Sequence, residues 1–305
     1  MRTERSKRAG AALLIALGGF SLLSVGDAVV KSMAGEWPAP AVSALRYCFG
    51  AIGLGAAVAL RHGRAGFVFP RPLLQAGRGL AVSLATICFF LGVMAMPLAD
   101  ATAIQFTSPF LTAMLSALVL RERVPRLAWG AIVIAFAGVL IVLRPNLLAV
   151  GGAALYPIGA ALGMAFLITF NRKSAGDAPI LVMQFTLALV AAPVLLVAAG
   201  TLDALGGPRF EIDRPSAEVV LKCAAVACTA SLGHMLIYRA TLHAGAALVS
   251  PMTYVQLFVA AALGWIVFGD APDIFTAAGA ALIIGGGLLL WRAQKPKPPA
   301  EGAPD

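Results

Sequence analysis

Charged residues are scarce in this sequence. Asp, Glu, Lys and Arg together make up only 12% of its 305 residues, whereas hydrophobic residues make up 60%. An average soluble domain has about 25% charged and 45–50% apolar residues. This shortage of charge excludes a soluble enzyme, a disordered protein and a secreted disulfide scaffold, and it favours a polytopic membrane protein.

The sequence also lacks the patterns of metal, redox and cofactor sites. Its four cysteines form no CxxC pair, and no His/Cys set has metal-ligand spacing. There is no HExxH, GxSxG or DDxxD motif and no Gly-rich phosphate loop. We therefore predict no catalytic residues, no metal and no cofactor, which leaves an intramembrane enzyme as the less favoured alternative. An ion channel would need rings of charged or carbonyl groups, and no such pattern is present.

What the sequence does contain is a series of long apolar runs. A helix that spans a bilayer needs about 20 mainly apolar residues, within a range of about 17 to 25. Ten stretches fall in this range: 10–33, 38–60, 75–96, 99–120, 127–143, 150–170, 178–200, 218–241, 245–268 and 273–292. The fold class predicted is an all-α polytopic membrane protein with ten transmembrane helices. The first run is too long for a cleavable signal peptide, and we interpret it as the first span.

Basic residues are unevenly divided between the loops on the two sides. If the N-terminus is inside, 17 of the 23 Lys and Arg residues fall in inner segments and five in outer ones. Inner loops are the ones that carry excess Lys and Arg. We predict a multi-pass protein of the cytoplasmic (inner) membrane with both termini cytoplasmic. The net charge of +9 then reflects topology, and no nucleic acid partner is expected.

The ten segments divide into two sets of five. We predict a cytoplasmic segment 1–9, a first repeat 10–147, a second repeat 148–292 and a disordered cytoplasmic tail 293–305. With five spans in each half, the second half enters the membrane inverted, as in many transporters. Residues 116–143 align with 264–291 at a fixed offset, which places Gly138 over Gly286.

Three stretches resemble a known family. They are 20–50, with FSLLSVGDAVVKSM and ALRYCFG, 98–124, which begins LADATAIQF, and 250–273, which begins SPMTYVQLF. These are similar to the EamA-type members of the drug/metabolite transporter superfamily. The resemblance implies two inverted five-helix repeats that move small metabolites by alternating access, and it leans towards export.

Opposite charges occur at matching depth in the first two segments. Asp27 and Arg46 lie ten and nine residues from Trp37, so both are about 14–15 Å inward from the outer interface. A charge at mid-membrane is costly and is expected to face the bundle interior. We interpret Arg46 as a contact for a substrate anion, and Asp27 as a contact for an amine or a carrier of a coupling proton. The alternative is a structural ion pair, either Asp27–Arg46 or Lys31–Asp27.

Neutral polar residues form a second group of candidates. The substrate-binding candidates near Pro109 and Pro251 are Gln105, Thr107, Thr112, Tyr254 and Gln256. Proline removes a backbone hydrogen bond and kinks a helix, and such kinks are tolerated in membranes where they line a cavity. The alternative is ordinary kink geometry with hydroxyl groups bonded between helices. Lys31 and His234 are further coupling candidates, His234 because its imidazole titrates near neutral pH.

These patterns predict a secondary-active transporter of a small polar metabolite. Arg46 with Asp27 suits an amino acid or related zwitterion, whereas Phe106 and Tyr254 suit a flavin-like or nucleoside-like ring. The expected partners are the small-molecule substrate, the lipid bilayer and a coupling proton. The sequence leaves open the substrate identity, the direction of transport, the coupling ion and the oligomeric state.

Overall fold

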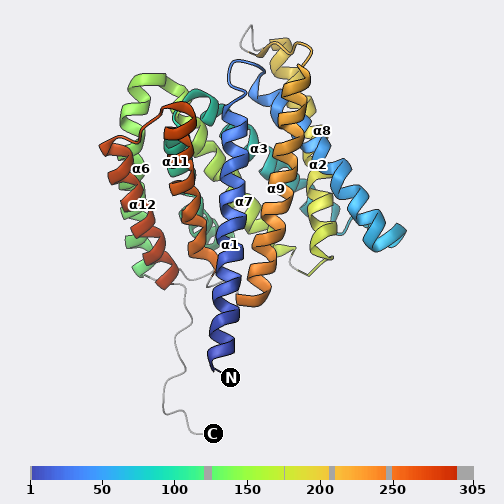
Figure 1. Ribbon diagram of the computed structural model, residues 1–305, viewed down its shortest axis with the longest axis horizontal. Coiled ribbons are helices and arrows are strands. Elements are labelled where there is room, and N and C mark those ends of the chain that lie inside the picture. The colour runs from blue at the N-terminus through green and yellow to red at the C-terminus, as the bar shows by residue number, and fades with distance from the viewer. Residues whose placement is uncertain (1, 120–125, 175, 206–209, 245–248, 294–305) are drawn as a thin grey trace.

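The computed structural model of the chain is a bundle of upright helices (Figure 1). It describes residues 2–119, 126–174, 176–205, 210–244 and 249–293, and no strand occurs in these ranges. The helices are α1 (Arg2–Lys31), α2 (Ala39–His62), α3 (Pro72–Ala95), α4 (Leu98–Gln105), α5 (Ser108–Val119), α6 (Arg126–Val150), α7 (Tyr156–Lys173), α8 (Ile180–Leu205), α9 (Ala217–Ala244), α11 (Val255–Phe268) and α12 (Ile274–Ala293). The start of α1 and the finish of α12 lie at the same end of the bundle, which we call the proximal end. The opposite end is the distal end.

Each of the ten predicted segments corresponds to helical structure. Six helices are long and apolar enough to cross a membrane, and three shorter apolar helices cover 129–143, 252–268 and 274–289. The remaining segment, 99–120, is divided into α4 and α5. The predicted all-α polytopic fold is therefore confirmed. One boundary differs, because α1 begins at Arg2 rather than at residue 10; residues 2–9 contain no proline or glycine, and most are good helix formers. The predicted disordered tail lies, from residue 294, outside the described residues.

The segments that contain Pro109 and Pro251 are both interrupted. α4 ends at Gln105 and α5 begins at Ser108, so that Pro109 lies in the first turn of α5. Pro251 lies in a short 3-10 helix, η4 (Ser250–Tyr254), before α11 begins at Val255. Proline is tolerated in a first turn because the N–H that it lacks has no intrahelical partner there. Each segment thus breaks close to its proline, in the interior of the bundle.

Helix packing has the symmetry of an inverted repeat. α1 packs along α9 as α3 packs along α7, while α2 pairs with α8, α4 with α11 and α6 with α12. Each segment of the first half corresponds to the segment at the same place in the second half, so that α1 corresponds to α7 and α3 to α9. Under this correspondence the α1–α9 pair becomes the α7–α3 pair, and each of the other three pairs is unchanged. The α6–α12 crossing shows the same symmetry in detail. Gly138 lies against Gly279 and Gly286 lies against Ala131, and the offset between Gly138 and Gly286 also relates Ala131 to Gly279.

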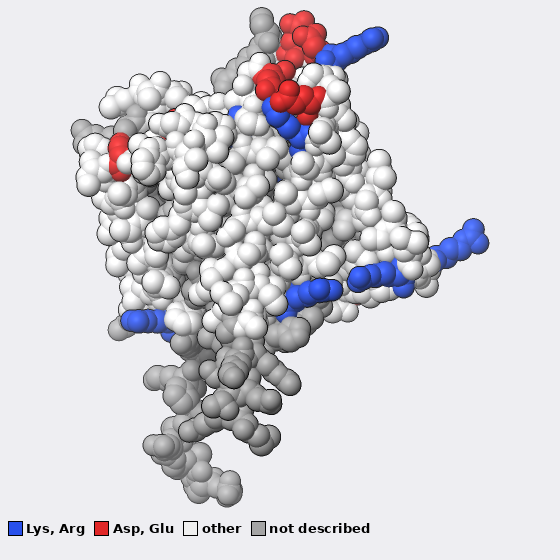
Figure 2. Space-filling view, in the orientation of Figure 1, with Lys and Arg blue, Asp and Glu red and all other residues white. Residues whose placement is uncertain are grey.

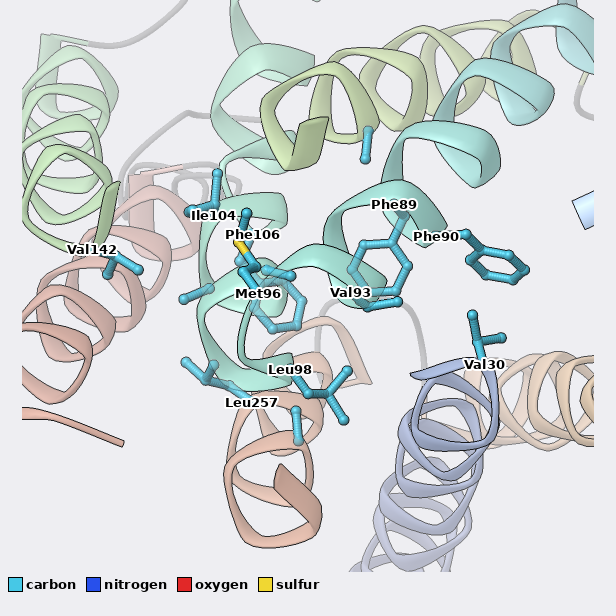
Figure 3. Packing of buried hydrophobic residues seen from close by; sticks show 14 of the residues in the cluster. Val30, Phe89, Phe90, Val93, Met96, Leu98, Ile104, Phe106, Val142 and Leu257 are labelled. Atoms are coloured by element: carbon cyan, nitrogen blue, oxygen red, sulfur yellow. The ribbon is translucent and has the colours of Figure 1, made fainter. Parts of the chain in front are cut away.

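The distal half of the bundle has a packed hydrophobic core. Figure 3 shows side chains of α1, α3, α4, α6 and α11 that meet there, among them Val30, Val93, Leu98 and Leu257. Val30, Val93 and Leu98 are fully buried, and they lie near the distal ends of their helices. We call this cluster the distal plug, because it fills the bundle between the distal end and its middle.

Candidate functional site

A cavity of about 540 Å³ occupies the other half of the bundle. It extends from mid-height to the proximal end, and α2, α3, α8 and α9 supply most of its wall. Five of the residues singled out in the sequence line this one cavity, although they come from five different helices. They are Asp27, Arg46, Gln105, His234 and Gln256.

Arg46 is held by aromatic rings. Its guanidinium carbon lies 4.6 Å from the ring centre of Tyr47 and 5.4 Å from that of Phe90. The Tyr47 hydroxyl is in turn 3.2 Å from Thr86 Oγ1, which fixes the ring. Stacking of this kind stabilises the cation through the ring faces and leaves the in-plane N–H donors available. No carboxylate among the described residues lies within 4.0 Å of Arg46, so these donors can bind an anionic ligand from the cavity.

Asp27 and His234 lie within electrostatic reach of Arg46. Asp27 forms no ion pair within 4.0 Å with Arg46 or with Lys31, all three being described residues. Lys31 instead binds Asp270 Oδ2 at 2.7 Å and the Met96 carbonyl at 2.8 Å. Neither of the two hypothesised pairs, Asp27–Arg46 or Lys31–Asp27, is formed in this conformation. Lys31 lies one helical turn further out, where its side chain reaches the loop between α11 and α12.

The two helix breaks deliver neutral polar groups to the cavity. Gln105 is the last residue of α4, and Gln256 is the second residue of α11. The side-chain Nε2 of Gln256 donates to Thr253 Oγ1 at 3.1 Å, and the backbone carbonyl of Gln256 accepts from Ser24 Oγ at 3.0 Å. These bonds attach the start of α11 to α1 beside Asp27.

Three other candidates do not line the cavity in this conformation. The hydroxyls of Thr107 and Thr112 donate to carbonyls of their own segment, at 2.8 and 2.7 Å. Tyr254 is buried in the core with its ring edge-on to Phe106, at 5.6 Å between ring centres. Their contact with substrate, and the stacking role suggested for Phe106 and Tyr254, stay predictions. Lys31 also lies outside the cavity wall.

The structure brings in residues that the sequence analysis did not select. Arg78, Asn171 and Gln184 line the proximal part of the cavity, and Arg78 falls inside the predicted third segment. That position within a span was the available signal; the 17 basic residues of the inner segments include Arg78, although it lies inside the span. Asp100 was not selected either. It is buried and accepts hydrogen bonds from Asn146 Nδ2, at 2.8 Å, and from Thr276 Oγ1, so it joins α4 to α6 and α12.

Polar contacts close the distal end above the distal plug. Besides the Lys31–Asp270 pair, Lys222 Nζ binds Glu36 at 3.0 Å, and Trp37 Nε1 donates to the Asp213 carbonyl at 3.0 Å. The cavity therefore reaches one end of the bundle while the other end is closed. Where the chain is described, no three His, Cys, Asp or Glu residues are grouped as metal ligands.

Comparison with known proteins identifies the family. The model of the EamA-like transporter family matches residues 10–144 and again 151–292. The pseudopaline exporter of Pseudomonas aeruginosa is 27% identical, over 93% of this chain and 96% of its own. The S-adenosylmethionine uptake transporter of Rickettsia prowazekii is 26% identical, over 89% of each chain. The riboflavin transporter of Rhizobium johnstonii is 29% identical, over 96% and 95%. With a ten-segment helical bundle that the family model matches twice, this chain belongs to the EamA-like transporter family.

Proposed function

We propose that this protein is a secondary-active carrier that moves a small zwitterionic metabolite, such as an amino acid or a derivative of one, across the cytoplasmic membrane. Arg46 carries this proposal. Its guanidinium is oriented by two aromatic rings in the middle of the bundle and faces the cavity without a carboxylate partner among the described residues. A planar guanidinium binds a carboxylate through two parallel hydrogen bonds. Asp27, which lines the same cavity, then meets the amine of the substrate.

The shape of the cavity supports transport by alternating access. It is open towards the proximal end and closed at the distal end by the distal plug and the Lys31–Asp270 pair. An inverted repeat allows the two halves to exchange these arrangements, so that the site faces one side and then the other. The surface charges support a cytoplasmic proximal end, because Lys and Arg follow its rim while Asp and Glu gather at the distal end (Figure 2). The conformation described is then the inward-facing one.

A proton is the coupling ion that the cavity supports best. Asp27 and His234 both line the cavity and both exchange protons in the biological pH range when their surroundings change. Arg46 lies within electrostatic reach of both, and a substrate carboxylate bound to Arg46 would add a negative charge beside them. Binding of substrate and binding of a proton are therefore linked through the same three residues.

A second candidate substrate is an aromatic or heterocyclic metabolite. Tyr47, Phe89 and Phe90 line the cavity next to Arg46 and offer ring faces for stacking. The riboflavin transporter among the relatives supports this alternative. It differs from the first proposal in a testable way, because stacking does not require a carboxylate on the ligand.

The experiment is a thermal-shift screen on the purified protein with matched pairs of ligands. Each amino acid is tested beside its amide, which lacks the carboxylate, and riboflavin and nucleosides form a third group. A ligand that binds the folded state raises the melting temperature. We expect stabilisation by acids and little by their amides, and loss of this difference in Arg46→Gln. Equal stabilisation by acid and amide would refute the carboxylate contact, and stabilisation by heterocycles alone would favour the second candidate. A hit is then loaded into vesicles, where a carrier shows saturable exchange.

A further inference from the structure

A second arginine of the cavity lies nearer to the proximal end. Arg78, on α3, lines the wall together with Asn171 of α7 and Gln184 of α8. Its side chain is confined between these helices, and the residue is only 4% exposed. Arginine is rarely buried to this extent unless it is paired with an opposite charge.

Neutral acceptors hold Arg78 in place. Its Nε donates to Asn171 Oδ1 at 2.6 Å, and its Nη1 donates to Gln75 Oε1 at 2.5 Å and to the Met183 carbonyl at 3.3 Å. No carboxylate oxygen of a described residue lies within 4.0 Å of it. Asp177 acts electrostatically on Arg78 from a greater distance. Its Oδ1 is paired with Arg71, which lies directly before α3. The guanidinium is thus oriented but not neutralised, and Nη2 has no hydrogen-bond partner in the described part of the chain.

The backbone around Arg78 is shaped for this placement. Glycines flank it on both sides, and a Cβ on Gly79 would lie only 2.3 Å from Val190 Cγ1 of α8. A Cβ on Gly77 would lie 3.2 Å from the ring of Phe170 on α7. These glycines let α3 approach both neighbours closely, and Arg78 lies buried between them.

Arg78 is separate from the site at Arg46. Thr86, which is bonded to Tyr47 beside Arg46, lies eight residues further along α3 than Arg78. That spacing corresponds to about 12 Å along the helix axis. The described wall between and around them is strongly basic, with one carboxylate, Asp27, against four arginines. These are Arg46, Arg61, Arg78 and Arg239.

We propose that Arg78, with Asn171 and Gln184, forms a second anion subsite near the proximal mouth of the cavity, which binds a carboxylate or phosphate group. This inference rests on the proposed function in taking the cavity as the substrate path. A substrate that carries two anionic groups binds both arginines at once, and one with a single group is captured at Arg78 before it moves to Arg46. The preferred substrates are therefore metabolites with more than one anionic group.

The test uses one cysteine as a reporter of local charge. In a variant without the four native cysteines, Leu181→Cys, which lines the same wall one turn from Gln184 on α8, is reacted with a negatively charged and a positively charged methanethiosulfonate reagent. We expect the anionic reagent to be favoured, and Arg78→Gln to lower the ratio of the two rates roughly tenfold. Malonate and inorganic phosphate are the competing probes. At least one of the two anions should slow the reaction of the cysteine in a saturable way, and the more effective one identifies the preferred oxyanion.

Controls separate this subsite from the rest of the cavity. Protection of Leu181→Cys should persist in Arg46→Gln, so the subsite can be present even if the proposed role of Arg46 fails. Arg78→Lys keeps the charge and should keep the rate ratio; a fall to the level of Arg78→Gln would show that structure was lost instead of charge. The proposal is overturned if neither anion protects, if protection survives in Arg78→Gln, or if it disappears in Arg46→Gln.

Discussion

Arg46 is the residue on which substrate affinity should depend most. The rings of Tyr47 and Phe90 orient its guanidinium. Each charge-assisted hydrogen bond from this group to a substrate carboxylate contributes about 1.5–3 kcal/mol of binding free energy. Arg46→Lys keeps the charge but loses the planar fork. We expect Arg46→Lys to raise the Kd of a carboxylate substrate by about tenfold or more, and Arg46→Gln to raise it further. Binding titration of a ligand from the thermal-shift screen measures this.

The matched control is Arg64, an exposed arginine outside the cavity wall. Arg64→Lys should leave the Kd unchanged. The melting temperature without ligand should be similar in the Arg46 variants and the original protein, because no described carboxylate is left unpaired. An Arg46→Gln variant that binds normally but is strongly destabilised would assign Arg46 a structural role.

At the level of single residues, the sequence identifies polar side chains inside the spans, but it does not show which neighbouring helix each of them faces. Asp27 and Arg46 were predicted because a charge inside a span is costly and is expected to face the interior, whereas Gln105 and Gln256 were predicted from nearby prolines and His234 from its imidazole; all five line the cavity. Which interior face each one occupies depends on the packing of other helices. The hydroxyls of Thr107 and Thr112 bond back to their own segment, an option that the same composition allows.

The sequence alone did not predict ion-pair and hydrogen-bond partners that are far apart along the chain. Lys31 binds Asp270 across 239 positions, and Asp100 bonds to Thr276 across 176. Arg78 was misjudged because a count of loop charges does not distinguish an arginine in a loop from one in the first turns of a span. Its three hydrogen-bond partners also lie on other turns and helices, which the local sequence does not show.

Among the helices, the α6–α12 crossing makes a sharp prediction from adjacent glycines. A Cβ on Gly286 would lie 2.9 Å from the Ala131 carbonyl oxygen, whereas a Cβ on Gly285 would meet nothing within 4 Å. Gly286→Ala forces the two backbones apart and should cost about 1–3 kcal/mol of stability. Gly285→Ala should be neutral or stabilising by up to about 1 kcal/mol, because alanine favours the helix. Thermal unfolding in detergent measures both.

The inverted repeat extends this prediction to the first half. Gly138 is related to Gly286 by the repeat offset, and its Cβ would lie 2.7 Å from the Gly279 carbonyl oxygen. Gly138→Ala should therefore destabilise about as much as Gly286→Ala. A harmless Gly138→Ala beside a costly Gly286→Ala would contradict the symmetric crossing.

Lys31 is expected to act as a latch between α1 and the α11–α12 loop. Its pair with Asp270 is partly buried at the distal end, where it closes the bundle above the distal plug. Such a pair contributes about 1 kcal/mol, so its loss should raise the distal-open fraction roughly fivefold. A single cysteine at Val93, which is 0% exposed, should react faster with an impermeant thiol reagent from the distal side in Lys31→Ala.

The charge swap provides the decisive arm of this experiment. Lys31→Asp combined with Asp270→Lys restores an opposite pair and should slow the Val93→Cys reaction again. Lys222→Ala, which breaks the pair with Glu36 at the same end, is the control for a general loss of charge and should have a smaller effect. Equal rates in all variants would remove the latch role of Lys31.

On the scale of the whole molecule, composition and segment length were sufficient for the fold class. Ten apolar runs predict ten spans because lipid allows only helices or closed barrels to cross it. The sequence could not show where the cavity lies, since a cavity depends on how the two halves tilt against each other. It also could not show that the cavity opens towards the proximal end while the distal plug closes the other end.

The last prediction concerns the orientation of the molecule in the membrane. Lys and Arg line the proximal rim and acids gather at the distal end (Figure 2), and basic loops are retained on the cytoplasmic side. Arg64 follows α2 at the proximal end, and Arg214 precedes α9 at the distal end; both residues are exposed. In intact cells an impermeant maleimide should label Arg214→Cys and should label Arg64→Cys only after the membrane is permeabilised, in a variant without native cysteines. Each substitution removes one charge from a 17-to-five split, too little to reverse it. Labelling of Arg64→Cys alone in intact cells would mean that the cavity faces outward, and labelling of both would mean that the chain inserts in two orientations.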